Sequence, residues 1–224
     1  MTHYAPVTHA LFDMDGLLLD TEIIYTQVTQ QIVGRFGKIF DWSIKSNMLG
    51  RRAEESSRYL VNALQLPISP EDYLNERDAL LREAFPLCAE LPGAKKLVSH
   101  LSNIAVPIAV ASSSSRELFE LKVKNHPWFS LFDAIVTGDD PDIREGKPAP
   151  DIFLRAAKLI DGSPKHTLVF EDAPSGLAAA TAAGMRTVVV PDANMDRSRY
   201  QGAALILDSL LEFSLADFGL PKIE

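Results

Sequence analysis

The sequence is poor in cysteine, has fewer basic than acidic residues and contains no long hydrophobic run. Its one cysteine, Cys88, excludes an intrachain disulfide and a cysteine metal cluster. The net charge of -8 argues against a nucleic-acid or anionic-membrane partner, because both require a basic surface. No apolar run approaches the ~20 residues that cross a bilayer, and the N-terminal MTHYAPVTHA lacks the pattern of a signal peptide. We therefore expect a cytoplasmic protein.

Short apolar runs recur along the chain and are followed by polar or glycine-containing turns. They read THALF, PIAVA, AIVT, TLVF, TVVV and ALIL. Continuous rather than alternating apolarity is typical of strands covered on both faces of a parallel sheet. Helical patterns such as PDIFLRAAKLI and PSGLAAATAAG lie between these runs. The alternation predicts an α/β fold with a Rossmann-like, doubly wound parallel-sheet core.

One long segment interrupts this alternation. Residues 20–89 contain helical patterns and no strand-like run, which is far too long for an ordinary connection. Within it, SPEDYLNERDALLREAF begins with Ser69 as an N-cap and Pro70 in the first turn of a helix. We expect residues 1–19 and 90–224 to form the core and residues 20–89 to be an inserted, all-helical cap domain.

Polar residues follow the predicted strands, and in an open parallel sheet ligands bind beyond the carboxyl ends of the strands. These residues are Asp13 and Asp15, Ser112 and Ser113, Lys147, and Glu171 and Asp172. Four carboxylates crowded together repel one another unless a cation joins them. Oxygen ligands without histidine or cysteine favour Mg²⁺. A metal beside a lysine and a hydroxyl can hold a phosphate, and a carboxylate there can attack phosphorus.

Four stretches, FDMDG, VASS, GKPAPDIF and FEDAPSG, resemble in order the four motifs of the haloacid dehalogenase-like hydrolases. The resemblance covers essentially the whole chain, including a helical cap after the first motif. It implies Asp13 as the nucleophile and Asp15 as general acid and then base. It implies phosphate binding by Ser112 and Lys147, with help from the Ser113 amide. Mg²⁺ would be held by Asp13, the Asp15 carbonyl and Asp172, with Glu171 either a ligand or a partner of the ligands.

Three longer stretches of the sequence indicate the class of substrate. FDWSIKSNMLGRRA, GDDPDIREGKPAPDIF and FGLPKIE resemble a helical-cap branch, β-phosphoglucomutase-like, that includes pseudouridine-5′-phosphatases and plant glycerol-3-phosphate phosphatases. The implied substrate is a small sugar, polyol or nucleotide monophosphate. Arg51 and Arg52 in the insert are candidate substrate-binding residues, and solvent exposure of either is an equal alternative. We expect a monomer or a weak dimer.

Two other functions stay open at this point. A sugar phosphomutase similar to β-phosphoglucomutase would share all four motifs, but that enzyme has a histidine where Tyr25 falls here. A phosphate-binding or receiver-like signalling module would also combine acids, a hydroxyl and a lysine around an acceptor aspartate, but it would lack the large helical insertion. Asp139 and Asp140 either support the site or belong to a surface loop.

Overall fold

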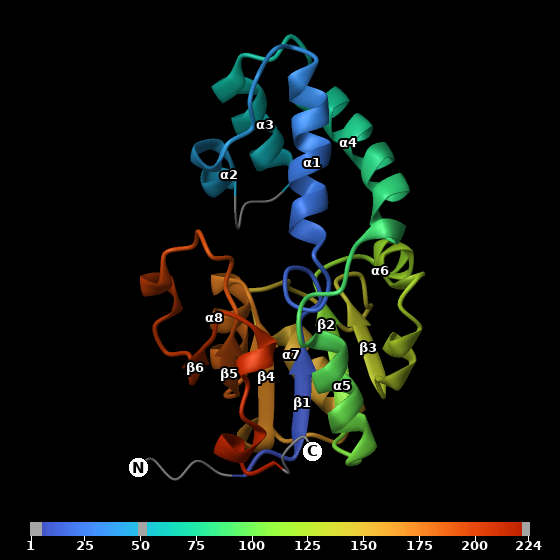
Figure 1. The fold of residues 1–224 in the computed structure, drawn as a ribbon, viewed down its shortest axis with the longest axis vertical. Coiled ribbons are helices and arrows are strands. Elements are labelled where there is room, and N and C mark those ends of the chain that lie inside the picture. Colours follow the sequence, from blue (N-terminus) through green and yellow to red (C-terminus); the bar gives the residue numbers. More distant parts are fainter. Residues whose placement is uncertain (1–5, 49–52, 221–224) are drawn as a thin grey trace. The chain divides into compact units, whose positions relative to one another are not determined.

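Figure 1 shows the computed structural model, which describes residues 6–48 and 53–220. The chain forms two compact units, one of residues 1–20 with 89–224 and the other of residues 21–88. The second unit is nearly the same segment as the expected insertion. That this unit works as a cap stays a prediction.

The first unit is built on a six-stranded sheet in which every neighbouring pair of strands is parallel. The strands are β1 (His9–Phe12), β2 (Ile108–Ser112), β3 (Ala134–Thr137), β4 (Thr167–Glu171), β5 (Arg186–Val189) and β6 (Leu205–Ile206). Their order is β3-β2-β1-β4-β5-β6, so the direction of winding reverses at β1. The expected α/β fold is confirmed, and all six apolar runs contain strands. The reversal places the carboxyl ends of β2, β1 and β4 side by side.

Helices cover both faces of this sheet, which explains the continuous apolarity of its strands. They are α5 (Ala94–Asn103), α7 (Asp151–Leu159) and α8 (Pro174–Ala182), and a further helix, α6 (Arg116–Val123), follows β2. Buried residues of α7 and α8 pack with Leu11, Val136 and Val169 of the sheet in one cluster. On strands β1 and β4, Phe12 and Phe170 stack with their ring centroids 4.6 Å apart. Alternation along β1 puts Phe12 on the opposite face from Leu11, the face that α5 covers (Figure 1).

The second unit is all-helical within its described residues. Its helices are α1 (Thr21–Gly34), α2 (Trp42–Met48), α3 (Ala53–Leu64) and α4 (Pro70–Ala84). Helix α4 begins as expected, because the Ser69 hydroxyl accepts a hydrogen bond from the Asp72 amide and Pro70 occupies the first turn. The hydroxyls of Tyr73 on α4 and Thr29 on α1 are 3.1 Å apart and join the two helices.

Among the described residues, no helix is both long enough and apolar enough to cross a membrane.

Asp139 connects the loops that follow β2 and β3. Its carboxylate accepts hydrogen bonds from the Arg116 amide at 2.9 Å and the Thr137 hydroxyl at 2.7 Å. The Arg116 guanidinium in turn donates to the Ile135 carbonyl at 2.9 Å. The hydrogen bonds from Thr137 and Arg116 lower the pKa of the Asp139 carboxyl below its usual value. Asp139 therefore fixes the position of the loop that carries the serines after β2.

We predict that Asp139→Asn lowers the melting temperature near neutral pH. The lowered pKa means that the charged carboxylate stabilises the fold above its unfolded pKa of about 4, and that this contribution is lost as pH falls through the folded value. Thermal unfolding of the variant and the wild type should therefore converge once the pH falls below the lowered pKa of Asp139. Asp161→Asn, at an exposed aspartate outside both loops, serves as the control. A difference that persists unchanged at low pH would contradict this account.

Candidate active site

The turn after β1 places two aspartates at the edge of the sheet. The Asp13 amide donates to the Phe170 carbonyl at 2.9 Å, which extends the pairing of β1 with β4 by one residue. The Met14 carbonyl accepts from the amides of Leu18 and Leu19, and Gly16 adopts a φ of 77°, so the chain turns sharply. Met14 is fully buried between the two aspartates. The apolar run is interrupted because β1 ends and this turn begins.

Lys147 joins the loop after β3 to the ends of β1 and β4. Its ammonium donates to Asp13 Oδ1 at 2.5 Å, to Glu171 Oε1 at 2.7 Å and to the Ala111 carbonyl at 3.0 Å. The side chain is 6% exposed, so these three acceptors replace water around a buried charge. Segments 134 residues apart in the sequence thus meet at one ammonium group.

Glu171 occupies a confined position beneath the start of α8. Its Oε2 atom accepts hydrogen bonds from the amides of Asp172 and Ala173, both at 2.9 Å. A Cβ at Gly176 would lie only 1.7 Å from Glu171 Oε1, so glycine is required for the carboxylate to fit. Glu171 is 1% exposed and is a partner of Lys147.

The electrostatics of Asp13 and Lys147 reflect their burial. Burial raises the pKa of Asp13 to about 7; Lys147 opposes this effect, while Glu171 and Asp15 add to it. Burial by itself would lower the pKa of Lys147, but Asp13 and Glu171 outweigh it and the net pKa is raised. Lys147 is therefore positively charged at neutral pH. The positive charge of Lys147 therefore does not fully offset the combined effect of burial, Glu171 and Asp15 on Asp13.

Asp15 has its own set of partners. Its Oδ2 atom accepts from the Ser112 hydroxyl at 3.3 Å and from the Ser114 hydroxyl at 3.0 Å. Its Oδ1 atom accepts from the Lys122 ammonium at 2.6 Å. Ser112, the last residue of β2, is fully buried. The two aspartates of FDMDG are thus held by different lysines.

The structure brings most of the expected site residues to one edge of the sheet. Asp13, Glu171 and Lys147 are in direct contact, and Asp15 contacts Ser112. Asp172 is half-buried at the start of the α8 segment, and its carbonyl accepts from the Tyr200 hydroxyl at 2.8 Å.

Two expected or possible site residues, Ser113 and Asp140, lie outside these contacts. Ser113 is exposed, and a Cβ at Gly138 would lie 2.4 Å from its carbonyl oxygen. Arg51 and Arg52 lie outside the described residues. Asp140 pairs with Arg155 at 3.6 Å rather than with the cluster at the strand ends.

Sequence reasoning missed Lys122, Ser114 and Tyr200. In the run LKVKNH, Lys122 resembles a solvated lysine at the end of a helix, yet it lies three residues after the buried Phe119 and shares its face. The only sign of its burial in the sequence was that Lys122 shares a helix face with the apolar Phe119. Ser115, by contrast, is the N-cap of α6 and accepts a hydrogen bond from the Leu118 amide. Nothing in the local sequence around Tyr200 points to Asp172.

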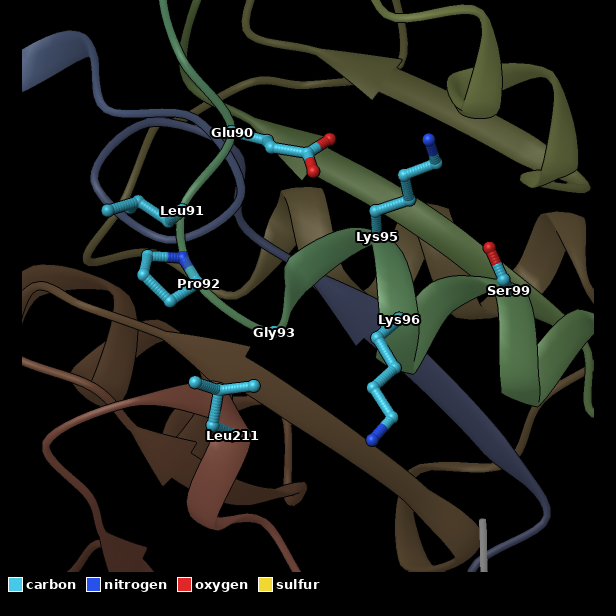
Figure 2. A pocket seen from close by; sticks show the side chains of 8 residues that line it. All are labelled: Glu90, Leu91, Pro92, Gly93, Lys95, Lys96, Ser99 and Leu211. Carbon is cyan, nitrogen blue, oxygen red and sulfur yellow. The ribbon is translucent and has the colours of Figure 1, made fainter. Parts of the chain in front are cut away.

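A shallow pocket of about 410 Å³ lies elsewhere on the first unit, at the start of α5 (Figure 2). Its lining residues are Glu90, Leu91, Pro92, Gly93, Lys95, Lys96, Ser99 and Leu211. Figure 2 shows the two lysines extending from successive positions of α5. None of these residues belongs to the cluster at the strand ends. The cluster, and not this pocket, is the candidate site, because it brings buried, oppositely charged side chains into contact.

Comparison with known proteins agrees with this geometry. The model of the family described as haloacid dehalogenase-like hydrolase matches residues 10–190. (DL)-glycerol-3-phosphatase 2 of Arabidopsis thaliana is 45% identical over 97% of this chain and 93% of that protein. A probable pseudouridine-5′-phosphatase of Drosophila melanogaster is 42% identical over 96% of this chain and 95% of that protein.

The fold is also similar to that of solved structures. A HAD family hydrolase from Deinococcus radiodurans R1, crystallised with bound phosphate and sodium, superposes with a TM-score of 0.82. The two are 27% identical, over 98% of this chain and all of the other. The family match spans β2 to β5 and all of β1 except its first residue, and it includes Asp13, Asp15, Ser112, Lys147, Glu171 and Asp172. The chain therefore belongs to the haloacid dehalogenase-like hydrolases.

Proposed function

We propose that this protein is a Mg²⁺-dependent phosphatase that hydrolyses small phosphate monoesters through an aspartyl-phosphate on Asp13. The observation that carries the proposal is the buried contact of Lys147 with both Asp13 and Glu171, beside a second aspartate held by Ser112. A phosphate dianion repels a carboxylate nucleophile, so the nucleophile must lie among positive charges. Lys147 supplies one such charge at 2.5 Å from Asp13.

The residues present fit a divalent cation. When all four are ionised, Asp13, Asp15, Glu171 and Asp172 carry four negative charges, against the two positive charges of Lys147 and Lys122. Burial raises the pKa of Asp13 to about 7 despite its contact with Lys147, and a bound cation would favour the ionised form of this carboxyl group. The donors are all oxygens, as Mg²⁺ prefers.

We assign Mg²⁺ to the Asp13 carboxylate, the Asp15 carbonyl and Asp172. Among the described residues, no three side chains of histidine, cysteine, aspartate or glutamate are grouped as a metal site. The assigned set is compatible with that observation, since it uses two carboxylates and one backbone carbonyl. When bound, the ion supplies positive charge that offsets the negative charge of the phosphoryl group.

The chain's own residues perform two displacements. A carboxylate oxygen of Asp13 bonds to phosphorus, the bond from phosphorus to the ester oxygen breaks, and protonated Asp15 donates its proton to the departing alkoxide. Ionised Asp15 then takes a proton from water, which attacks phosphorus and releases inorganic phosphate from Asp13. Lys147, Ser112 and the Ser113 amide hold the phosphoryl oxygens during both steps.

The substrate is a polyol, sugar or nucleotide monophosphate. The relatives named for glycerol 3-phosphate and pseudouridine 5′-phosphate support this class. We assign the choice among these substrates to the helical unit, with Arg51 or Arg52 as a contact to the substrate. A cytoplasmic location and a monomeric or weakly dimeric state stay predictions.

Hydrolysis is favoured over the alternatives. Tyr25, which stands where β-phosphoglucomutase has a histidine, packs edge-on against Phe85 with ring centroids 5.5 Å apart. An aromatic ring in this contact cannot replace the acid-base chemistry of an imidazole at neutral pH. The receiver-like module loses its support because the chain belongs to a hydrolase family.

We predict that Asp13→Asn lowers kcat on glycerol 3-phosphate by roughly 10³-fold or more, because the amide cannot act as the nucleophile. Release of inorganic phosphate in the presence of Mg²⁺ measures the effect. Without Mg²⁺ the variant should melt at the same or a higher temperature than the wild type, since a buried charge is removed. Retained turnover in a folded variant would refute the assigned nucleophile.

Metal removal provides an independent prediction. Chelation with EDTA should abolish turnover by the wild type, and added Mg²⁺ should restore it. Mg²⁺ should also raise the melting temperature, because a ligand that binds only the folded protein stabilises it. Asp172→Asn should need at least about tenfold more Mg²⁺ for the same rise. An equal response of both proteins to Mg²⁺ would remove Asp172 from the assigned ligands.

Gly176→Ala tests the position of Glu171. The added methyl group would occupy the space of the Glu171 carboxylate and displace it from Lys147. We expect kcat/KM to fall by at least about tenfold, because misplacing a catalytic group by about 1 Å has such effects. Gly146→Ala is the matched control, since a Cβ there meets no atom within 4 Å. Equal activities of the two variants would contradict the role given to the contact between Glu171 and Lys147.

A further inference from the structure

Lys122 is a buried charge that the reaction outlined above does not use. It lies on α6, the helix that follows the serine loop after β2, and it is 0% exposed. Neighbouring Lys124, at the end of the same helix, is exposed. The burial of one of these two lysines requires a specific explanation, because lysine is almost never fully buried unless it is paired.

The partners of Lys122 converge on Asp15. The Lys122 ammonium donates to Asp15 Oδ1 at 2.6 Å and to the Ser114 hydroxyl at 2.8 Å. The Ser114 hydroxyl donates to Asp15 Oδ2 at 3.0 Å. The three groups thus form a closed network in which both carboxylate oxygens of Asp15 are held.

Stability alone is a poor reason for this arrangement. Burying an ammonium carries a large desolvation cost, and a protein with an apolar side chain in the same place is often equally stable or more so. The position shares its helix face with Phe119, which is buried, so an apolar residue would pack there. Asp15 itself keeps 24% of its side chain exposed, so the network fixes a carboxylate that is open to solvent on one side.

We propose that Lys122 and Ser114 are positioning residues for Asp15, and that they hold its carboxyl group in the orientation needed for proton transfer to the leaving group. The inference rests on the proposed phosphatase function. It divides the work between two lysines: Lys147 contacts the Asp13 carboxylate and Lys122 contacts the Asp15 carboxylate. Neither Lys122 nor Ser114 needs to touch the substrate.

The choice of substrate provides the first test. An alkyl phosphate such as glycerol 3-phosphate releases a strongly basic alkoxide and depends on a proton donor. p-Nitrophenyl phosphate releases a stable phenolate, and its transfer to Asp13 depends little on one. General acid catalysis contributes about 10²–10⁴-fold, so Lys122→Met should lower kcat on glycerol 3-phosphate by at least about 10²-fold. The KM should change by less than about threefold, because the network does not grip the substrate.

The same variant should largely retain the first step with the aryl substrate. The rate of the p-nitrophenol burst, measured by rapid mixing, should fall by less than about tenfold, whatever happens to the later attack of water. Ser114→Ala should show the same pattern with a smaller loss. Lys124→Met is the matched control, because it removes the same charge from the same helix at an exposed position, and it should behave as the wild type.

A double-mutant cycle distinguishes positioning from a structural role. If Lys122 acts through Asp15, Lys122→Met should have no further effect on p-nitrophenyl phosphate turnover in an Asp15→Asn background. Equal losses in both backgrounds, or a Lys122→Met enzyme as active as Lys124→Met, would overturn the inference. If Lys122→Met does not fold, the same cycle with Ser114→Ala and Asp15→Asn distinguishes positioning from a structural role by the same criteria. A wild type that hydrolyses neither substrate would refute the phosphatase proposal itself, and this outcome differs from all the others.

Discussion

The burial of carboxylates at the ends of two adjacent strands, β1 and β4, is the constraint on which the site depends. Asp13 and Glu171 are both nearly excluded from solvent, and a carboxylate in that environment is unstable without positive charge beside it. Lys147 meets this need by contacting both groups and one backbone carbonyl. Burial still raises the pKa of Asp13 to about 7, because Lys147 does not fully offset the cost of burying its negative charge. A carboxylate cluster of this kind favours the binding of a cation, whose charge can then offset that of an anionic substrate.

The surrounding structure holds these groups in place. Gly176 leaves room for the Glu171 carboxylate, and the amides of Asp172 and Ala173 fix one of its oxygens. The loops after β2 and β3 are joined through Asp139. The hydroxyl of buried Tyr200 holds the carbonyl of Asp172. Rigid support of this kind matters because electrostatic stabilisation of a transition state requires groups that are already oriented.

The two aspartates of FDMDG are two residues apart, yet they have different surroundings. Asp13 is almost fully buried against Lys147, whereas Asp15 is partly exposed and held by Lys122 with two serines. A nucleophile must stay ionised, while a proton donor and acceptor must change its protonation state during the reaction. Because Lys147 contacts Asp13 and Lys122 contacts Asp15, each carboxyl group has its own electrostatic environment. The proposed division of labour follows from this separation.

The sequence by itself determined the parallel sheet, the long helical insertion, the strand-end positions of Asp13, Ser112 and Glu171, and the position of Lys147 in the loop after β3, because periodicity and motif order are local properties. It did not distinguish Lys122 from Lys124, or Ser114 from Ser115, since each pair is chemically identical and nearly adjacent. Only the tertiary structure decided that one lysine is buried against Asp15 and that Tyr200 reaches Asp172. Those contacts join residues 107 and 28 positions apart, and their partners are set by the packing of helices and loops on the sheet.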